Sequence, residues 1–513
     1  MRICRMSTTS FPCKWWALIG LSLLSFTAFL DFTIVSTAIP FIQKSLHASV
    51  LDLQWVNNIF ALVLSMFMIA AGYFGDRFGR RRIYYLGFVF FAIAAIGAAL
   101  SQSIEWLIFF RAVQGFAAAI IFTIGVALLP QAFPADEQNR AIGIFSAITG
   151  IGLAIGPFLG GLLITYFSWR WVFWVNLPII VIGLLMCSFS LQAPPKGNTN
   201  ARMDWWGFVL LIIGIGCLIY GLIHGEQMGW ALTSTWAYII VGIIGIITLL
   251  IVECRLEHPM LELSVLKNPI TRLATLCACA AGLITFVLFF FDPLFLNITR
   301  GETAFVIGTL LLATPVVQVI LSLQLSRLIK AFGLVGLFII ALLAGLVSGV
   351  LHGFLGTLSP IWFIVLAFAL MGVTWGVANS GVIAAVSSSV DPAKIGSGIG
   401  TVFTLWNIAG SIFLALSAAL FNSSEKHKMA HILTQKDIAL DPSQHQLVSA
   451  MLKDPSNAHT LAQSYNGLHA DTLYQSFQQA FLHGFHTVAW FVVIVMAIMA
   501  VLGLCFAKTC KTK

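Results

Sequence analysis

The sequence predicts an all-α polytopic membrane protein with fourteen membrane-spanning helices. Of its 513 residues, 59% are hydrophobic and 9% are charged, whereas soluble domains carry about 25% charge. Apolar runs of ~20 residues, the length that crosses the ~30 Å hydrocarbon core, recur along the chain. The basic residues lie mostly in the short segments between these runs. These observations indicate that most of the chain is surrounded by lipid.

The predicted spans follow from the apolar runs taken in order. The first run follows several basic residues, as in a signal peptide, but it is too long and continues into Asp31, so we interpret it as an uncleaved helix. The fourteen spans are residues 15–38, 55–75, 83–101, 106–128, 140–165, 171–190, 205–224, 234–254, 273–296, 304–325, 334–354, 361–386, 395–420 and 483–507.

The basic residues predict the orientation of these spans. An even number of spans places both termini on one side, and with the termini in the cytoplasm the inner segments hold nineteen Lys and Arg. The short outer segments then hold three. This asymmetry predicts cytoplasmic termini. The net charge of +8 is distributed over these loops rather than gathered in a patch, so we expect no nucleic-acid partner.

One long outer loop, residues 421–482, is polar enough to be soluble. Its alternating polar and apolar residues predict one or two short amphipathic helices. His427 and His431 are one helical turn apart, as a pair of metal ligands would be. A solvated polar loop explains these histidines equally well, so we predict no metal site.

The connection after the second run, "GYFGDRFGRRR", combines spaced glycines with charges. Glycine allows a sharp turn and a close approach of the backbone. The carboxylate of Asp76 can accept hydrogen bonds or pair with a guanidinium, and the arginines suit the lipid head groups. A generic basic turn is the alternative interpretation.

This connection resembles the loop signature of the major facilitator superfamily, although Phe74 replaces the usual leucine. The resemblance predicts a cytoplasmic gate made of Gly72, Asp76, Arg77, Gly79, Arg80 and Arg81.

The fifth run contains "GIGLAIGPFLGG", in which three glycines recur every four residues and form one bare stripe. A neighbouring helix can pack against such a stripe at short range, and the proline loosens the helix beside it. Ordinary packing of small residues is the alternative. The stretch resembles the fifth-helix signature of proton-coupled exporters in the same superfamily, at Gly152, Gly156, Pro157, Gly160 and Gly161.

Two opposite charges lie inside apolar runs, where an ionised side chain is costly. Asp31 lies seven residues before the outer end of the first run, and Arg111 lies five residues past the outer end of the fourth. At 1.5 Å per residue, both are roughly 8–10 Å below the same surface. The surrounding stretches, "LDFTIVSTAIP" and "RAVQG", resemble signatures of the fourteen-helix branch of drug/proton antiporters, as does "QWVNNIFAL" in the second run.

The resemblance implies the major facilitator fold. We expect an N-terminal six-helix bundle at residues 1–192, two inserted helices and a cytoplasmic linker at 193–272, and a C-terminal six-helix bundle at 273–513 that includes the loop 421–482. A partial echo of the first loop signature, "LSRLIKAFG", supports two related halves. In this fold the first and fourth helices share one bundle and face a central cavity.

We therefore expect Arg111 and Asp31 to be coupled, directly or through Gln114 and water. Protonation of Asp31 would neutralise one side of this coupling, and a cationic substrate would compete for the same carboxylate. A static buried ion pair is the alternative. We expect the substrate cavity to be lined by Gln54, Trp55, Asn58, Gln114, Trp406 and Asn407.

Asp292, in "FFFDPLFL", is the other acid inside an apolar run. It lies about four residues from the outer end of the ninth span, so it either faces the interface or takes part in proton coupling or substrate binding. His352 lies near a span end and is expected to be interfacial.

The predicted function is proton-coupled secondary active export of amphipathic, hydrophobic or cationic small molecules by alternating access. We expect no cofactor, with the proton gradient as the energy source, because the chain has no nucleotide-binding loop. The expected partners are the small-molecule substrate, protons and the lipid bilayer of a bacterial inner membrane. The oligomeric state stays open, and a monomer is one option.

Two alternatives are retained. The first is a dedicated exporter of one metabolite, such as a siderophore, because the motifs describe the coupling machinery rather than the pocket. The second is a polytopic enzyme acting on lipid, which would need clustered ligands or a nucleophile with its base. No such arrangement is visible in the sequence, so we do not expect an enzyme.

Overall fold

The structure is a computed structural model that describes most of the chain. The described residues are 11–133, 137–190, 204–228, 232–256, 261–389, 395–435, 442–453, 455, 458, 461–462 and 470–511. Within these residues the elements are helices and none is a strand. Twelve of the helices are long and apolar enough to cross a membrane. The predicted all-α membrane fold is therefore confirmed.

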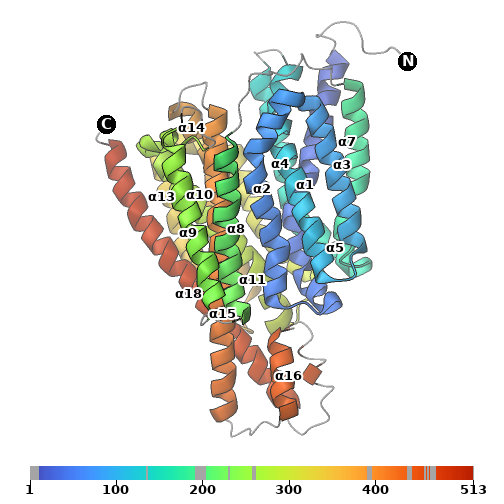
Figure 1. The fold of residues 1–513 in the computed structure, drawn as a ribbon, viewed down its shortest axis with the longest axis vertical. Helices are drawn as coiled ribbons and strands as arrows, with labels where there is room; N and C mark the ends of the chain where they lie inside the picture. The colour runs from blue at the N-terminus through green and yellow to red at the C-terminus, as the bar shows by residue number, and fades with distance from the viewer. Residues whose placement is uncertain are drawn as a thin grey trace.

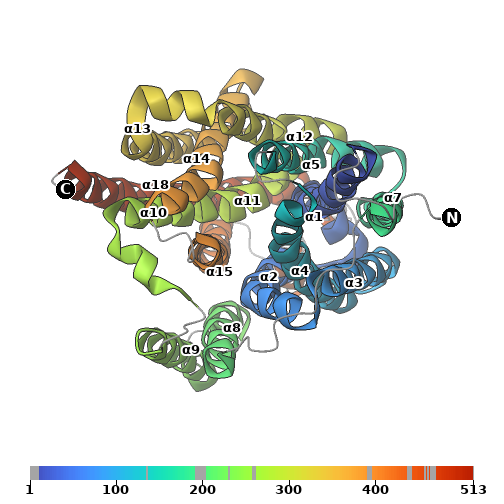
Figure 2. The same ribbon diagram turned by 90° about the horizontal axis from the view of Figure 1, so that it is seen from above.

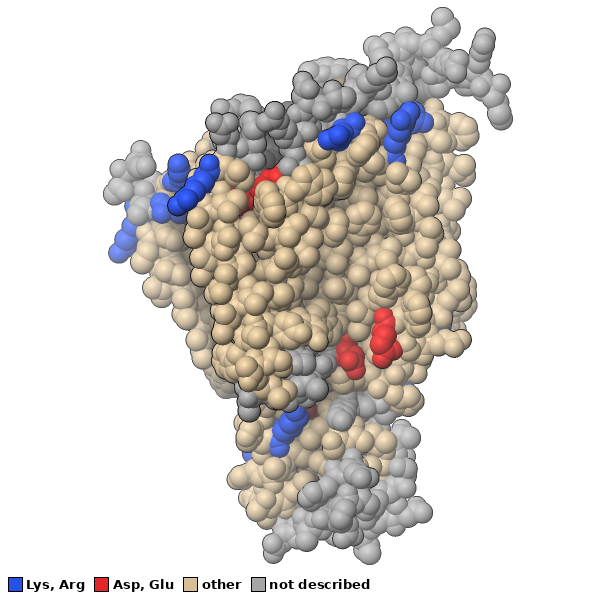
Figure 3. All heavy atoms as spheres, in the orientation of Figure 1, with Lys and Arg blue, Asp and Glu red and all other residues tan. Residues whose placement is uncertain are grey.

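The charges follow the same plan on the face shown in Figure 3. Lys and Arg side chains gather near one end, and a broad band between the two ends carries no charged group. Helix α1 begins, and the last helix ends, at this basic end (Figure 1). We call it the terminal end and the opposite end the α16 end, after the helix that projects from it.

The first half of the chain forms one bundle, seen on the right of Figure 2. Helix α1 packs along α5 and α7, and α4 packs between α2 and α3. The bundle consists of α1 (Phe11–Leu46), α2 (Val50–Phe78), α3 (Arg80–Leu100), α4 (Ile104–Ala132), α5 (Gln138–Tyr166), the short α6 (Trp171–Trp174) and α7 (Asn176–Ser190).

The C-terminal half forms a second bundle. One of its spans is continuous but changes type along its length: α10 (Pro269–Leu283), the π-helix η2 (Ile284–Leu288), α11 (Phe289–Leu294) and the π-helix η3 (Phe295–Thr299). It follows the 3₁₀ turn η1 (Leu263–Lys267). The other members are α12 (Ala304–Leu311), α13 (Ala313–Gly353), α14 (Ile361–Ser389), α15 (Ile395–Gln435) and α18 (Ala470–Lys511).

Two further helices, α8 (Trp205–Met228) and α9 (Thr233–Glu253), pack mainly against each other. They stand beside α2 and α15, at the edge of the junction between the bundles (Figure 2). They therefore flank the two bundles and do not separate them.

The number of spans is not settled by the helices alone. One of the twelve segments, Ala304–Gly353, has 50 residues, which at 1.5 Å per residue is about 75 Å. Within it, Gly333 has non-helical backbone angles (φ 69°, ψ 162°) and separates two lengths that could each cross the bilayer. Helix α2 has 29 residues and is not among the twelve. The predicted count of fourteen stays a prediction.

The expected loop at 421–482 is partly wrong. Helix α15 continues without a break to Gln435, and α18 already begins at Ala470, so both helices project beyond the bundle at the α16 end (Figure 1). Between them lies α16 (Pro442–Lys453). Residues 421–435 are polar but contain neither Gly nor Pro, so nothing in this stretch ends the helix. His427 and His431 lie on the exposed face of this extension.

Candidate functional site

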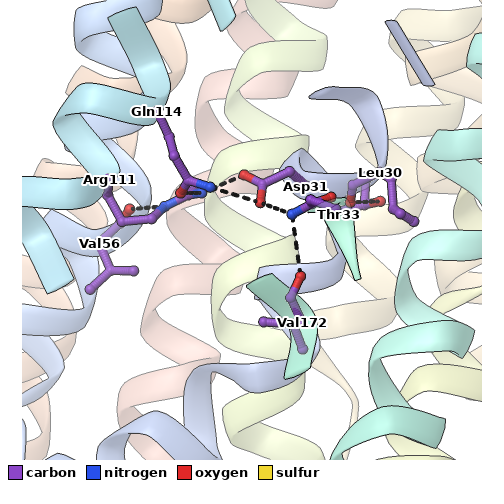
Figure 4. Close-up of polar contacts among 8 residues, drawn as sticks. Leu30, Asp31, Thr33, Val56, Arg111, Gln114 and Val172 are labelled. Carbon is purple, nitrogen blue, oxygen red and sulfur yellow. Dashed lines mark hydrogen bonds and ion pairs between the residues drawn. The ribbon is translucent and has the colours of Figure 1, made fainter. Parts of the chain in front are cut away.

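The Asp31 cluster is a buried set of polar side chains in the N-terminal bundle, composed of Asp31, Arg111, Gln114 and Asn176 (Figure 4). Nη1 of Arg111 lies 2.5 Å from Oδ2 of Asp31. The other carboxylate oxygen, Oδ1, accepts hydrogen bonds from the amide nitrogens of Gln114 at 3.3 Å and Asn176 at 3.0 Å. Both oxygens of this buried carboxylate are therefore satisfied.

Arg111 is held by more than its ion pair. Its Nε donates to the carbonyl of Val56 on α2 at 3.2 Å, and Nη1 also donates to Oε1 of Gln114 at 2.8 Å. The guanidinium lies 4.3 Å from the centre of the Phe60 ring, a cation–π contact. Arg111 therefore joins α1, α2 and α4, and the carboxylate of Asp31 adds α7 through Asn176.

The local sequence of α4 explains this geometry. Arg111 and Gln114 are three residues apart, so both project from one face of the helix. Gly115 lets α4 approach α2 closely, because a Cβ there would lie 2.4 Å from the carbonyl oxygen of Phe60. That close approach brings the guanidinium over the ring of Phe60 and within reach of Val56.

Asn176 is the member of the cluster that the sequence did not indicate. It is the first residue of α7, and it also lies 3.4 Å from the carbonyl of Val172 one turn earlier. The only available signal was a single amide in the otherwise aromatic and apolar stretch "WVFWVNLP".

A cavity of about 30 Å³ lies beside the cluster, between the two bundles. This volume holds about one or two water molecules. Arg111 lines the cavity, whereas Asp31 does not, so the guanidinium stands between the carboxylate and the cavity. The full lining is Phe32, Ser36, Phe60, Arg111, Thr285, Phe286 and Phe289.

The residues predicted for the substrate cavity lie elsewhere around this junction. Gln54 and Asn58 are fully buried on α2, and their amides have no hydrogen-bond partner among the described residues. The ring of Trp55 lies 6.4 Å from that of Tyr220 on α8. Their role in substrate binding stays a prediction.

The two residues predicted from α15 also lie outside the lining of this cavity. Trp406 is 6% exposed, and its ring stacks on Phe403 at 5.7 Å. The amide of Asn407 donates to the carbonyl of Phe403 at 2.8 Å. Their predicted contact with substrate is likewise untested.

Asp292 and His352 form a second buried pair, in the C-terminal bundle. Both side chains are 0% exposed, and Oδ1 of Asp292 lies 3.4 Å from Nε2 of His352. The expectation that His352 is interfacial is wrong. It lies near the end of α13, but α13 packs against both α14 and α18, so a position near a span end is here still inside the protein.

The residues of the predicted gate lie at the turn between α2 and α3. Gly79 has a φ of +98°, which only glycine adopts readily, and a Cβ there would meet no atom within 4 Å. Arg77 donates to the hydroxyl of Tyr73, and Arg81 reaches Tyr85 and the carbonyl of Ser188 on α7. The side chain of Asp76 lies outside the described residues. The predicted gating role is not tested by these contacts.

The glycines of α5 serve two interfaces. A Cβ on Gly156 would lie 2.0 Å from Oγ1 of Thr33 on α1, so this face is closely packed inside the N-terminal bundle. A Cβ on Gly161 would lie 2.4 Å from the carbonyl of Ala304 on α12, in the other bundle. On α5, Gly152 and Gly160 also face α1, and Pro157 approaches Gly308 of α12. In the predicted gate, Gly72 and Gly75 face α4, and Arg80 begins α3.

Comparison with known proteins supports the family. A family model described as Major Facilitator Superfamily matches residues 21–414. The multidrug resistance protein Stp of Mycobacterium tuberculosis (strain CDC 1551 / Oshkosh) is 34% identical over 319 residues, covering 62% of this chain and 59% of Stp. This match therefore spans less than two thirds of that relative. The tetracenomycin C resistance and export protein of Streptomyces glaucescens is 28% identical over 494 residues, covering 92% of this chain and 88% of the relative.

Solved structures show the same fold. The bacterial homologue of the human lysosomal transporter Spinster, in an inward-facing and occupied conformation, superposes with a TM-score of 0.67 over 96% of this chain and 97% of that chain. Its sequence identity is 16%, so this likeness concerns the fold alone. With the family match, the helical architecture and the buried charges of the spans in agreement, the chain belongs to the major facilitator superfamily of membrane transporters.

Proposed function

We propose that the protein is a proton-coupled antiporter that exports amphipathic, hydrophobic or cationic small molecules by alternating access. One observation carries the proposal: the buried carboxylate of Asp31 pairs with Arg111, and Arg111 lines the cavity between the two bundles. A proton carrier and a substrate contact are therefore adjacent.

The chemistry of the pair links the proton to the cavity. Arginine does not lose its charge in proteins, so a proton that binds Asp31 converts a neutral pair into a cation. A buried cation without a counter-charge is strongly disfavoured. The guanidinium would then turn toward another acceptor, and the cavity that it already lines is the nearest place for one. A cationic substrate that pairs with the carboxylate of Asp31 would bind in competition with the proton.

The lining of the cavity suits amphipathic compounds. It is mostly phenylalanine, with the hydroxyls of Ser36 and Thr285 and the guanidinium of Arg111 as the polar groups. Drug-sized ligands need about 300–1,000 Å³, so substrate binding requires the bundles to move apart from the 30 Å³ arrangement. A cationic substrate would also require Arg111 to uncover Asp31.

Contacts between the bundles support alternating access. Near the α16 end, α5 and α12 approach closely through Gly161 and Gly308. These glycines leave smooth surfaces on which one bundle can rock against the other. We further propose that the terminal end faces the cytoplasm of a bacterial cell, which makes export the outward direction.

The test is substrate-driven proton movement in liposomes. Purified protein is reconstituted with an internal pH dye, a proton gradient is imposed, and lipophilic cations and neutral amphiphiles are added one at a time. We expect proton movement on addition of a substrate, reduced at least tenfold in Asp31→Asn. Asp52→Asn is the matched control, because the contacts described for Asp52 are those of a capping box with Ser49 at the start of α2. If Asp31→Asn and Asp52→Asn behave alike, Asp31 does not carry the proton.

A dedicated exporter of one metabolite is the second candidate. The relative that covers most of both chains is named for resistance to and export of one compound, tetracenomycin C. If no compound of the panel causes proton movement in liposomes that still hold a proton gradient, this candidate is favoured. The search would then turn to compounds that the host secretes.

A further inference from the structure

The Asp292–His352 pair has no role in the mechanism proposed above, although it is a fully buried pair of titratable side chains in the C-terminal bundle. Both side chains are 0% exposed. His352 stacks on Phe368 of α14 with ring centres 5.6 Å apart. The residues beside Asp292 are aromatic too, since the ring of Phe291 lies 5.1 Å from that of Phe421 on α15.

The hydrogen bonding of His352 determines where its ring proton lies. Nδ1 is 2.7 Å from the carbonyl oxygen of Ser348. A carbonyl oxygen can only accept a hydrogen bond, so Nδ1 carries a hydrogen. A neutral ring then presents the lone pair of Nε2 to Oδ1 of Asp292, 3.4 Å away. Two lone pairs facing each other repel, so this contact is favourable only when one proton lies between them.

We propose that Asp292 and His352 form a second proton-binding site, which holds one proton between Oδ1 and Nε2. The proposal rests on the proposed antiport function and adds a site in the other bundle. With the proton bound, the pair is neutral overall, either as two neutral groups or as an imidazolium and a carboxylate. Without it, the pair carries one negative charge among aromatic rings, where an unpaired charge is costly.

Other charges on the neighbouring elements do not satisfy this pair. Among the described residues, neither oxygen of Asp292 nor Nε2 of His352 has any hydrogen-bond partner, and their contact is the ion pair just described. Helices α12 and α14 carry no charged or histidine side chain. The charged and histidine side chains on the remaining elements are Lys14, Asp31 and Lys44 on α1, Arg272 on α10, Arg300 and Glu302 after η3, Arg327 and Lys330 on α13, Glu425, Lys426, His427, Lys428 and His431 on α15, and Asp471, His483, His486, Lys508 and Lys511 on α18.

The helix that carries Asp292 connects the pair to the cavity. Helix α11 lies between the π-helices η2 and η3. π-Helices are rare in proteins, and those that occur are often found at functional sites. Thr285 and Phe286 of η2 and Phe289 of α11 line the cavity. A change of charge at Asp292 would therefore act on a segment that contains two π-helices, and the same segment supplies the side of the cavity that belongs to the C-terminal bundle.

The first test measures proton binding without substrate. Infrared difference spectra of the protein in lipid films are recorded between stepped pH values, following carboxyl and imidazole bands. We expect one titration step that disappears in Asp292→Asn and also in His352→Gln. His486→Gln is the matched control, because His486 also contacts a backbone carbonyl, that of Leu355, without an adjacent acid among its described contacts. It should retain the step. Persistence of the step in either Asp292→Asn or His352→Gln would overturn the proposal.

Folding of the variants is controlled by a conservative substitution and by the wild type. Asp292→Glu keeps a carboxyl group and should therefore retain part of the titration step that Asp292→Asn loses. A folding defect caused by substitution of Asp292 would remove the step in both variants. In the wild-type protein, ¹⁵N-histidine spectra assigned with His352→Gln should show the hydrogen of His352 on Nδ1 throughout the titration. A hydrogen on Nε2 alone, with Nδ1 bare, would also overturn the proposal.

The second test separates this site from the Asp31 cluster. In the liposome assay, the number of protons moved per substrate should fall in Asp292→Asn and in His352→Gln, with the double variant no worse than either single variant. Loss in Asp31→Asn together with full coupling in both of these variants would leave the proposed antiport intact and refute a role for the second site. No proton movement in the wild type with any compound of the panel would favour the dedicated exporter of one metabolite, and the infrared test would still decide proton binding at Asp292 and His352.

Discussion

Two buried carboxylates, one in each bundle, differ in how they are held. Asp31 receives hydrogen bonds on both oxygens, from Arg111, Gln114 and Asn176. Among the residues that the structure describes, the ion-pair partner of Asp292 is His352, at 3.4 Å. The first carboxylate is paired with a cation that is always charged, and the second with a ring that is charged only when it binds a proton.

This difference separates two ways of placing an acid in a membrane protein. The Asp31 cluster is stable as an ion pair and is disturbed when a proton arrives. The Asp292–His352 pair is stable when it holds a proton and is disturbed when the proton leaves. The two sites would therefore respond in opposite senses to the same change in proton concentration.

The largest effect should come from removing the permanent cation. Arg111→Gln leaves a buried carboxylate without its counter-charge, and breaking a buried pair in this way costs about 3–5 kcal/mol. His352→Gln should cost only about 1 kcal/mol, the net value of one hydrogen bond, because Asp292 can become neutral. Unfolding by SDS in mixed micelles measures both losses. Equal decreases in the free energy of unfolding of Arg111→Gln and His352→Gln would mean that the two buried pairs contribute equally to stability.

Asn176→Leu should shift the pH dependence of transport. It removes one of three donors to Asp31, so a proton competes better for the carboxylate and the profile moves to higher pH by about one unit, since ~1.4 kcal/mol corresponds to one unit. Initial rates from pH 5 to 9 measure this shift. Gln478→Leu is the control, because it removes an amide that donates to a backbone carbonyl, that of Ile298, and it should leave the profile in place. An unchanged profile in Asn176→Leu would show that Asn176 does not tune the site.

Glycine substitutions compare two similarly close helix contacts, that of α4 with α2 in one bundle and that of α14 with α13 in the other. A Cβ on Gly115 would lie 2.4 Å from the carbonyl of Phe60, and one on Gly372 would lie 2.3 Å from that of Thr314. Overpacking costs about 1–3 kcal/mol, so Gly115→Ala and Gly372→Ala should reduce stability similarly.

The two glycine variants should differ in transport. Gly115→Ala should also reduce proton coupling, because Gly115 adjoins Gln114 and contacts Phe60, whose ring the guanidinium of Arg111 covers. Gly216→Ala, where a Cβ meets no atom within 4 Å, is the control and should be neutral or slightly stabilising. Unaltered coupling in Gly115→Ala would separate this helix contact from the Asp31 cluster.

The smallest effect should come from an ion pair near the surface. Glu302→Gln removes the partner of Arg300 at 3.4 Å, and pairs that remain accessible to solvent contribute at most ~1 kcal/mol. Arg300 retains its hydrogen bonds to the carbonyls of Thr357 and Ser359. The same SDS assay should show a change below about 0.5 kcal/mol. A loss as large as that of Arg111→Gln would remove the distinction between buried and exposed pairs.

Properties that depend on distance along a helix could be predicted from the sequence. Composition predicts a membrane protein, and the fixed rise of a helix places Asp31 and Arg111 at matching depths, where the structure joins them at 2.5 Å. The turn glycine Gly79 was likewise visible, because its position between two long apolar runs and beside three arginines predicts a tight turn. These features need only the chain and the bilayer thickness.

Asn176 and the buried position of His352 were not predicted from the sequence. The predicted end of α15, at residue 420, came too early, and the predicted start of α18, at residue 483, came too late. Each depends on which helices become neighbours and on the direction in which a side chain points around its helix, and both are results of packing between segments far apart in the chain. A span such as α10 to η3, which changes from α to π and back, also shifts the direction of every later side chain. Depth in the membrane is therefore a local property that the order of residues encodes, whereas the contacts of Asn176 and His352 depend on which helices the bundle packs together.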